Sequence, residues 1–129
     1  MENTERFSNR VENYVLYRPH YPKKVITYLQ DQIGFDRRWI VADIGSATGI
    51  SSELFLENGN MVYCVEPNQK MRQAAEQQFK NKKTFKSIEG TAEATSLEDK
   101  SVDMIVAAQA FHWFDVATAQ KEFHRIAKK

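Results

Sequence analysis

The sequence predicts a single α/β domain, residues 1–129, built on a parallel sheet with helices on both faces. Three observations support this fold. Strand-like and helix-like patterns alternate along the chain. The apolar segment 39–44 leads directly into a turn of small residues, which is followed by a helical pattern. A chain of 129 residues with 42% hydrophobic residues can bury one core but is too short for two.

The elements follow in order from apolar periodicity and from the residues that end each pattern. Pro22 at a first-turn position begins a helix that Gly34 ends, and its apolar face includes Ile33. Asn68 and Asp115 are predicted to cap the helices that follow them. The expected helices span 4–17, 22–33, 51–58, 69–79 and 116–126, and the expected strands span 39–44, 61–66, 84–88 and 102–107.

The composition excludes several classes of function. Eighteen basic residues against 17 acidic residues give a formal net charge of +1, which does not favour capture of nucleic acid or of an anionic membrane. Three histidines and one cysteine are too few for a His/Cys zinc cluster, so no metal site is expected. Cys64 cannot form an internal disulfide, and the polar N-terminus lacks the pattern of a signal peptide. We therefore expect a soluble, cytoplasmic protein.

The most informative stretch is the run Val41-Ala42-Asp43-Ile44-Gly45-Ser46-Ala47-Thr48-Gly49. An apolar strand carries an acidic residue near its end and passes through a turn without side-chain bulk into a helix. Such a turn lets a ligand approach the backbone closely, and the free N–H groups of the helix start attract a carboxylate or phosphate. The next strand ends in Glu66, which is placed to accept hydrogen bonds from the two hydroxyls of a ribose. Together these features predict a site for a nucleoside-containing cofactor.

The spacing of the small residues indicates which cofactor is favoured. A dinucleotide fingerprint, G-x-G-x-x-G, would require a glycine where the chain has Ile50, and this disfavours a nicotinamide-dependent oxidoreductase. The spacing G-x-G-x-G fits Gly45, Ala47 and Gly49, with Asp43 two residues earlier. That pattern resembles the first motif of the class I S-adenosylmethionine (SAM) dependent methyltransferases, with alanine in place of the central glycine.

Further motifs extend this resemblance over nearly the whole chain. The segment 65–68 followed by Met71 looks like the second motif of the family, and 90–93 looks like its adenine-contacting loop. The strand 102–106 and the segment 109–114 look like the fourth strand and the loop that follows it. Residues 1–21 are similar to the lid-like N-terminal segment of small-molecule methyltransferases in the trans-aconitate methyltransferase group.

The resemblance implies a Rossmann-like fold, SAM as the cofactor and a small-molecule methyl acceptor. Methyl transfer from a sulfonium needs alignment and exclusion of water more than a proton-transferring group, so no catalytic side chain is assigned. The implied cofactor ligands are Tyr14, Arg18, Asp43, Gly45, Ser46, Ala47, Gly49, Glu66, Pro67, Met71, Ala92, Glu93, Gln109 and Ala110.

Most of these residues also have a purely structural interpretation. Asp43 can serve only to hydrogen-bond local N–H groups of the turn, and Met71 can belong only to the core. Glu66 can be a solvated residue at a strand end. Glu93 can be a solvated loop carboxylate, with the adenine contact made by the backbone at Ala92. Arg18 can pair with a surface carboxylate. His112 resembles a general base in position, but we favour a packing role for it beside its aromatic neighbours Phe111, Trp113 and Phe114.

Only about four of the seven strands of the family fold are expected in this sequence. The predicted fourth strand would then lie at an open sheet edge, where unpaired backbone groups favour association with another chain, such as a second copy in a homodimer. The sequence therefore resembles the cofactor-binding half of a methyltransferase, ending after the fourth strand. The alternative is an inactive, truncated SAM-binding module that pairs with or regulates a partner.

Overall fold

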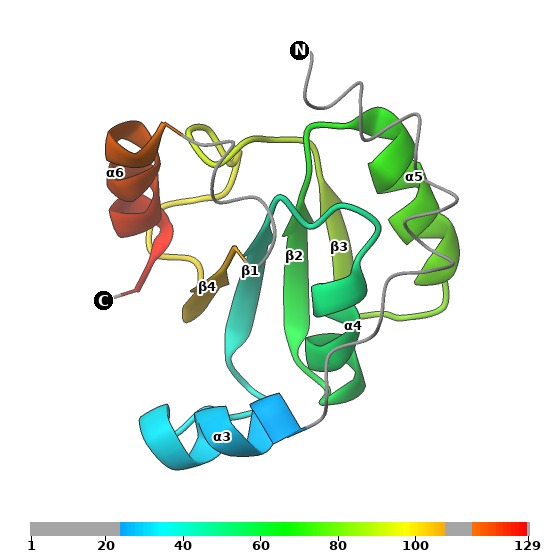
Figure 1. The fold of residues 1–129 in the computed structure, drawn as a ribbon, viewed down its shortest axis with the longest axis vertical. Coiled ribbons are helices and arrows are strands. Elements are labelled where there is room, and N and C mark those ends of the chain that lie inside the picture. The colour runs from blue at the N-terminus through cyan, green and yellow to red at the C-terminus, as the bar shows by residue number, and fades with distance from the viewer. Residues whose placement is uncertain (1–23, 108–114, 129) are drawn as a thin grey trace.

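A computed structural model of the protein describes residues 24–107 and 115–128, and predictions that fall on other residues lie outside it. Within these ranges four parallel strands form one sheet in the order β3-β2-β1-β4 (Figure 1). The strands are β1 (Ile40–Ile44), β2 (Met61–Val65), β3 (Phe85–Ile88) and β4 (Met104–Val106), and the helices are α3 (Lys24–Ile33), α4 (Ile50–Glu57), α5 (Gln69–Gln78) and α6 (Val116–Ile126).

Strand β1 is an inner strand of the sheet and pairs with β2 on one side and with β4 on the other. Asp43 lies opposite Cys64 of β2 and opposite Val106 of β4. All four strands run in the same direction, so their carboxyl ends meet at one edge of the sheet. The turn after β1 and the residue after β2 are therefore brought together there, as expected for ligand binding in an open α/β sheet.

Each face of the sheet has its own apolar core. On one face, Val41, Val62 and Cys64 pack with α4, α5 and the start of α3. On the other face, Ala42, Ile44 and Val65 pack with α6 and with the loop that precedes β4. The alternation along β1 explains this arrangement, since successive side chains point to opposite faces and both faces are covered. The predicted parallel sheet with helices on both faces is thus confirmed.

The boundaries of the four predicted helices that fall on described residues agree with the structure to within one or two residues, and the predicted helix 4–17 lies outside the described residues. Asn68 accepts a hydrogen bond from the Met71 N–H at 2.9 Å, and Asp115 accepts from the Thr118 hydroxyl at 2.9 Å. Gly34 follows α3 with a positive φ of 69°. Ile33, predicted to lie on the buried face of that helix, is instead 51% exposed because the helix ends at this residue, beyond the edge of the core.

The fourth strand is shorter than the predicted 102–107. Residue Val102 leaves the β1 pairing and forms an isolated parallel bridge with Ala127. Its N–H donates to the Ile126 carbonyl at 3.0 Å, and its carbonyl accepts from the Lys128 N–H at 2.9 Å. The chain after α6 therefore provides a partner that sequence periodicity could not reveal.

None of the helices described in 24–107 and 115–128 is long and apolar enough to cross a membrane.

Candidate cofactor site

The turn after β1, residues 45–49, is a compact loop tied to the neighbouring strand. The N–H groups of Gly45 and Ser46 both donate to the carbonyl of Val65, at 2.8 and 3.1 Å. Gly45, Ala47 and Gly49 have positive φ values of 67°, 54° and 93°. Three left-handed residues reverse the chain within five positions, and α4 then starts at Ile50. The predicted small-residue turn is thus present, and it lies at the carboxyl end of β1.

Gly49 is required by close packing as well as by its backbone angle. A Cβ atom at this position would lie 2.4 Å from Cε2 of Phe79, a buried ring at the end of α5. Ala47, by contrast, is a non-glycine residue that adopts the left-handed region, with a φ of 54°. That conformation costs an L-residue roughly 1–2 kcal/mol. The departure from the central glycine of the motif therefore leaves the shape of the turn intact at an energetic cost.

Glu66 is the residue that connects the end of β2 to this turn. Its Oε1 accepts the N–H of Ala47 at 2.7 Å, and its Oε2 accepts the N–H of Asn68 at 2.9 Å. The residue is only 7% exposed. Burial raises the pKa of the Glu66 carboxyl, and the two backbone N–H groups oppose that shift. Each carboxylate oxygen has a second lone pair, so both can still accept a hydroxyl of a ligand.

The loop after Glu66 is held in place by hydrogen bonds from Arg72 of α5. Arg72 donates from Nη1 to the carbonyls of Glu66 and Pro67, at 3.0 and 3.1 Å. Met71 is 1% exposed, which agrees with the core interpretation of this residue. Pro67 is half-buried. The backbone that presents the Glu66 carboxylate is thus fixed at the carbonyl of Glu66 itself and at that of the next residue, Pro67.

Asp43 lies beneath the turn, 1% exposed, and takes part in a network that sequence analysis did not predict. Its Oδ2 accepts the hydroxyls of Ser51 and Ser52, each at 2.6 Å, and the Cys64 thiol donates to the Ser52 hydroxyl at 3.0 Å. Burial raises the pKa of Asp43 to about 6, with the two serine hydroxyls opposing it. Burial and the Asp43 charge raise the pKa of the Cys64 thiol. The signal available in the sequence was a pair of serines in the first turn of the helix that follows the turn.

Thr48 is a second residue that the sequence analysis did not single out. Its side chain is fully buried in the turn, and its hydroxyl has no hydrogen-bond partner in the described part of the chain. A buried polar atom without a partner costs free energy, so this hydroxyl fits a site that a polar ligand completes. Together with the open lone pairs of Glu66, it indicates that this edge of the sheet fits a cofactor rich in hydroxyl and charged groups.

The loop 90–95 packs beside this edge and is anchored to α6. Ala92 is 3% exposed and belongs to the α6 side of the core. Oε2 of Glu93 accepts the N–H of Asp115 at 2.8 Å, so Glu93 ties the loop to the start of α6. Glu122 of α6 accepts the N–H and the hydroxyl of Thr95, at 2.8 and 2.6 Å. The predicted adenine contact of this loop stays a prediction.

Several predicted residues cannot be placed. The predicted ligands that lie outside the described residues are Tyr14, Arg18, Gln109 and Ala110. The segment with Phe111, His112, Trp113 and Phe114 lies outside them as well. Of the predicted ligands, the structure brings those of the turn 45–49 into hydrogen-bonding contact with Glu66 and its neighbour Val65. Asp43, near the end of β1, is hydrogen-bonded to the start of the helix that follows the turn.

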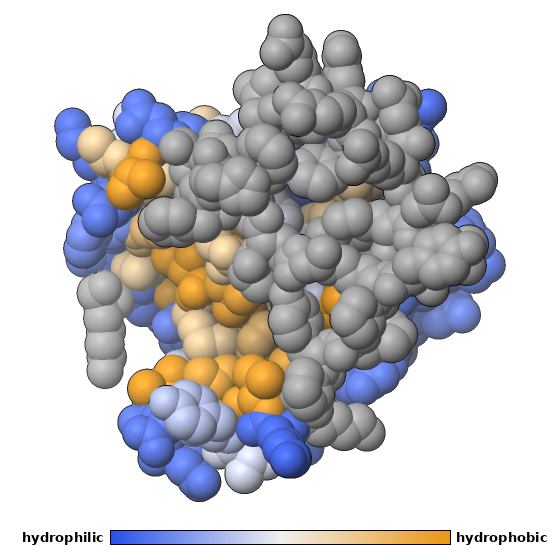
Figure 2. Space-filling model, viewed as in Figure 1, coloured by the Kyte–Doolittle hydropathy of each residue, from blue (hydrophilic) through white to orange (hydrophobic). Residues whose placement is uncertain are grey.

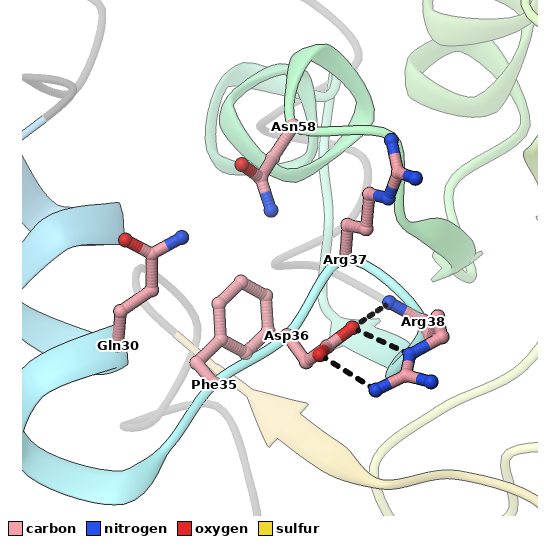
Figure 3. Close-up of a pocket in the computed structure, with 6 residues that line it drawn as sticks. All are labelled: Gln30, Phe35, Asp36, Arg37, Arg38 and Asn58. Atoms are coloured by element: carbon pink, nitrogen blue, oxygen red, sulfur yellow. Dashed lines mark hydrogen bonds and ion pairs between the residues drawn. The ribbon is translucent and has the colours of Figure 1, made fainter.

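A surface hollow lies at the opposite end of the sheet, between α3, α4 and the segment that enters β1 (Figure 3). Its most ordered feature is an exposed pair in which Arg38 donates from Nε and Nη2 to the carboxylate of Asp36, both at 3.0 Å. These bonds lower the pKa of Asp36 to about 2. The pair shapes the chain entering β1 and faces away from the turn 45–49, so the hollow is separate from the cofactor edge.

The fold and the site together define a class of protein. A parallel sheet with β1 between β2 and β4, a small-residue turn after β1 and a buried acid after β2 define a Rossmann-like domain for a nucleoside-containing cofactor. Residues 42–129 match the family model described as "Methyltransferase domain". The chain belongs to this family, and thus to the class I SAM-dependent methyltransferases that its motifs resemble.

Individual relatives agree with this assignment. The chain is 35% identical over 126 residues to an uncharacterized methyltransferase of Mycobacterium bovis, and 30% identical over 123 residues to an uncharacterized methyltransferase-like protein of Schizosaccharomyces pombe. Each match covers 95% of this chain and 47% of the relative, so the chain spans about half the length of these proteins. The crystal structure of a SAM-dependent methyltransferase from Aquifex aeolicus has the same fold, with a TM-score of 0.77 at 19% identity, over 93% of this chain and 66% of that one. The comparisons do not favour an inactive binding module.

Proposed function

We propose that this chain binds SAM at the edge formed by the turn 45–49 and Glu66, as the cofactor-binding part of an enzyme that methylates a small molecule. One observation carries the proposal. The Glu66 carboxylate is buried and fixed by two backbone N–H groups, yet each of its oxygens can accept one more hydrogen bond. A rigid bidentate acceptor beside a bulk-free turn suits a vicinal diol such as that of ribose.

The residues of the chain have separate parts in this proposal. The bound cofactor supplies an activated methyl group on a sulfonium, and the protein holds, orients and shields it. Glu66 accepts the ribose hydroxyls, and the turn with Gly45, Ser46 and Ala47 lies against the methionine portion. Asp43 supports that turn and supplies negative charge for the ammonium group. Ala92 and Glu93 border the adenine. Residues 1–21, with Tyr14 and Arg18, are proposed to cover the cofactor from the N-terminal side.

A small-molecule acceptor fits the charge of the chain better than a nucleic acid does. Basic and acidic residues nearly cancel, with a formal net charge of +1. Binding to a polyanion depends on neutralising phosphates with lysine and arginine, and such an excess is missing from the composition. The N-terminal resemblance to the trans-aconitate methyltransferase group supports the same class of acceptor.

We also propose that two copies of the chain associate through the edge formed by β4. Met104, Ile105 and Val106 are all half-buried, and no strand of the described residues pairs with their outer side. Figure 2 shows apolar side chains gathered on this face over β4 and along the side of α3 that faces the sheet. An unpaired apolar edge of this kind favours pairing with another strand. Light scattering with a mass measurement tests this, and a monodisperse monomer over a hundredfold range of concentration would contradict it.

Isothermal titration calorimetry with SAM and with S-adenosylhomocysteine (SAH), the demethylated product, tests the cofactor assignment. Both are expected to bind the wild-type chain, whereas NAD is not. Binding of NAD in preference to SAH would overturn the assignment in favour of an oxidoreductase. A radiolabelled methyl-transfer assay with a panel of small carboxylic acids then tests the activity. Transfer to RNA or to protein substrates alone would overturn the small-molecule proposal.

A further inference from the structure

The Asp43 carboxylate has an unusual environment for an acid placed beside a proposed cofactor site. It is 1% exposed, and its pKa is raised by burial to about 6. Two hydroxyls converge on the same oxygen, Oδ2, from adjacent positions in the first turn of α4. The cost of burying a carboxylate is therefore offset here by neutral hydrogen-bond donors.

Asp43 lies opposite Val106 of β4, and the polar and charged groups near it come from α4 and from β2 with the residue that follows β2. From α4, Ser51 and Ser52 donate to it at 2.6 Å each. On β2, Cys64 lies opposite Asp43 in the strand register. After β2, Glu66 is close enough that the charge of Asp43 contributes to raising the pKa of Glu66. The Cys64 thiol donates to Ser52, which leaves the Ser52 hydroxyl proton directed at Asp43. Arg72, the cation beside Glu66, donates to the backbone carbonyls of Glu66 and Pro67.

We propose that Ser51 and Ser52 are positioning residues that keep Asp43 ionised and oriented beneath the turn 45–49, and that cofactor affinity depends on this charge. The inference rests on the proposed SAM site, because the charge matters there for the ammonium of the cofactor. Both serine hydroxyls donate to Asp43, so each serine acts on the site through that carboxylate. The Cys64 thiol supports the arrangement by orienting the Ser52 hydroxyl.

A hydroxyl that donates to the ionised carboxylate stabilises the charged form and lowers the pKa of the acid. Removing Ser51 and Ser52 leaves the burial of Asp43 in place without its compensation. The pKa of Asp43 should then rise towards or beyond neutral pH, and the site should lose its negative charge at the pH where the wild type retains it.

The test combines a direct titration of Asp43 with ligand binding. Carboxyl ¹³C chemical shifts of labelled aspartates, with Asp43 assigned by Asp43→Asn, give the titration midpoint of the full chain without ligand. Calorimetry of SAH binding from pH 5 to pH 8.5 gives the pH profile of affinity. We expect Ser51→Ala/Ser52→Ala to move both midpoints upward by about one pH unit or more, with each single variant intermediate. Ser52→Thr, which keeps the hydroxyl, should restore the wild-type midpoint.

Ser87→Ala is the matched control, since the Ser87 hydroxyl donates to the Glu76 carboxylate at the same 2.6 Å, on the exposed side of β3 and α5. It should leave both midpoints unchanged. An Asp43 midpoint that does not move in either single serine variant would overturn the inference, even if SAH binds normally. A shifted midpoint with an unchanged SAH profile would overturn the link to cofactor affinity. If the wild type binds no SAH at any pH, the proposed function fails, and the titration still reports separately whether the serines hold the charge.

Discussion

The backbone N–H of Ala47 donates to Oε1 of Glu66 at 2.7 Å, which joins the turn after β1 to the residue after β2. The two residues are 19 positions apart and meet because β1 and β2 are parallel neighbours in register. Glu66 thereby has two functions at once. It shapes the turn by accepting the Ala47 and Asn68 N–H groups, and in the proposed complex its remaining lone pairs accept the hydroxyls of the ligand.

Replacing Glu66 should therefore affect cofactor binding and the turn together. Glu66→Ala removes the acceptor for the two ribose hydroxyls, and each hydrogen bond to a charged group is worth about 1.5–3 kcal/mol. SAH affinity is expected to fall at least tenfold in calorimetry. Glu66→Gln keeps one acceptor oxygen and the side-chain volume, so its loss should be smaller. Unchanged affinity in Glu66→Ala would remove the ribose assignment.

Ala47→Gly should stabilise the protein. Ala47 has a φ of 54°, a conformation that costs an alanine roughly 1–2 kcal/mol but a glycine nothing. The greater freedom of glycine in the unfolded chain offsets about 0.4–1 kcal/mol of that gain. The net expectation is a gain of about 0.5–1 kcal/mol in the free energy of unfolding, measured with urea. A loss of stability would show that the Ala47 methyl group makes contacts worth more than the strain.

Gly49→Ala should destabilise the protein more than Gly34→Ala does. Both glycines have positive φ values, 93° and 69°, so both variants incur backbone strain. A Cβ at Gly34 meets nothing within 4 Å, whereas one at Gly49 would overlap the buried ring of Phe79. Overpacking of this kind typically costs a further 1–3 kcal/mol, so the difference between the two variants in urea unfolding should be about that size. Equal losses would show that the Phe79 ring moves aside freely.

Asp43→Asn is expected to keep or raise stability while it weakens cofactor binding. The pKa of Asp43 is about 6 in the folded protein against an ordinary value of 3.8, so the folded state holds its proton more tightly than the unfolded state. Folding stability due to this group is therefore lost as the pH rises from about 4 to about 6, and the penalty is complete above pH 6. Asparagine carries no charge to bury and still offers an oxygen to the serines.

The variant should accordingly be more stable than the wild type at pH 7.5, by up to about 3 kcal/mol, the equivalent of about two pKa units. The advantage should disappear near pH 4, where the wild-type carboxyl is protonated in the folded protein. Urea unfolding at both pH values measures the difference. An Asp43→Asn protein that is less stable at pH 7.5 would show that the carboxylate is stabilised by its surroundings and not penalised.

The secondary-structure elements and the chemistry at the ends of the strands could be predicted from the amino-acid sequence. Periodicity predicted the sheet with helices on both faces, and local capping chemistry placed Asn68 and Asp115 correctly, because a cap depends only on residues three positions away. The positions of Asp43, the small-residue turn and Glu66 could be predicted because the carboxyl ends of parallel strands must share one edge.

The hydrogen bonds between these residues depend on the folded arrangement and could not be predicted from the sequence. The Glu66 bond to Ala47, the Asp43–Ser52–Cys64 network and the link from Glu93 to Asp115 join residues 9 to 22 positions apart through register and helix placement. The shortening of β4 has the same cause, since Val102 forms a bridge with Ala127, through hydrogen bonds to Ile126 and Lys128, rather than continuing the β1 ladder. Periodicity reports which face of an element is apolar. The partners of a buried polar atom depend on which elements are brought beside it, and that is a property of the folded chain.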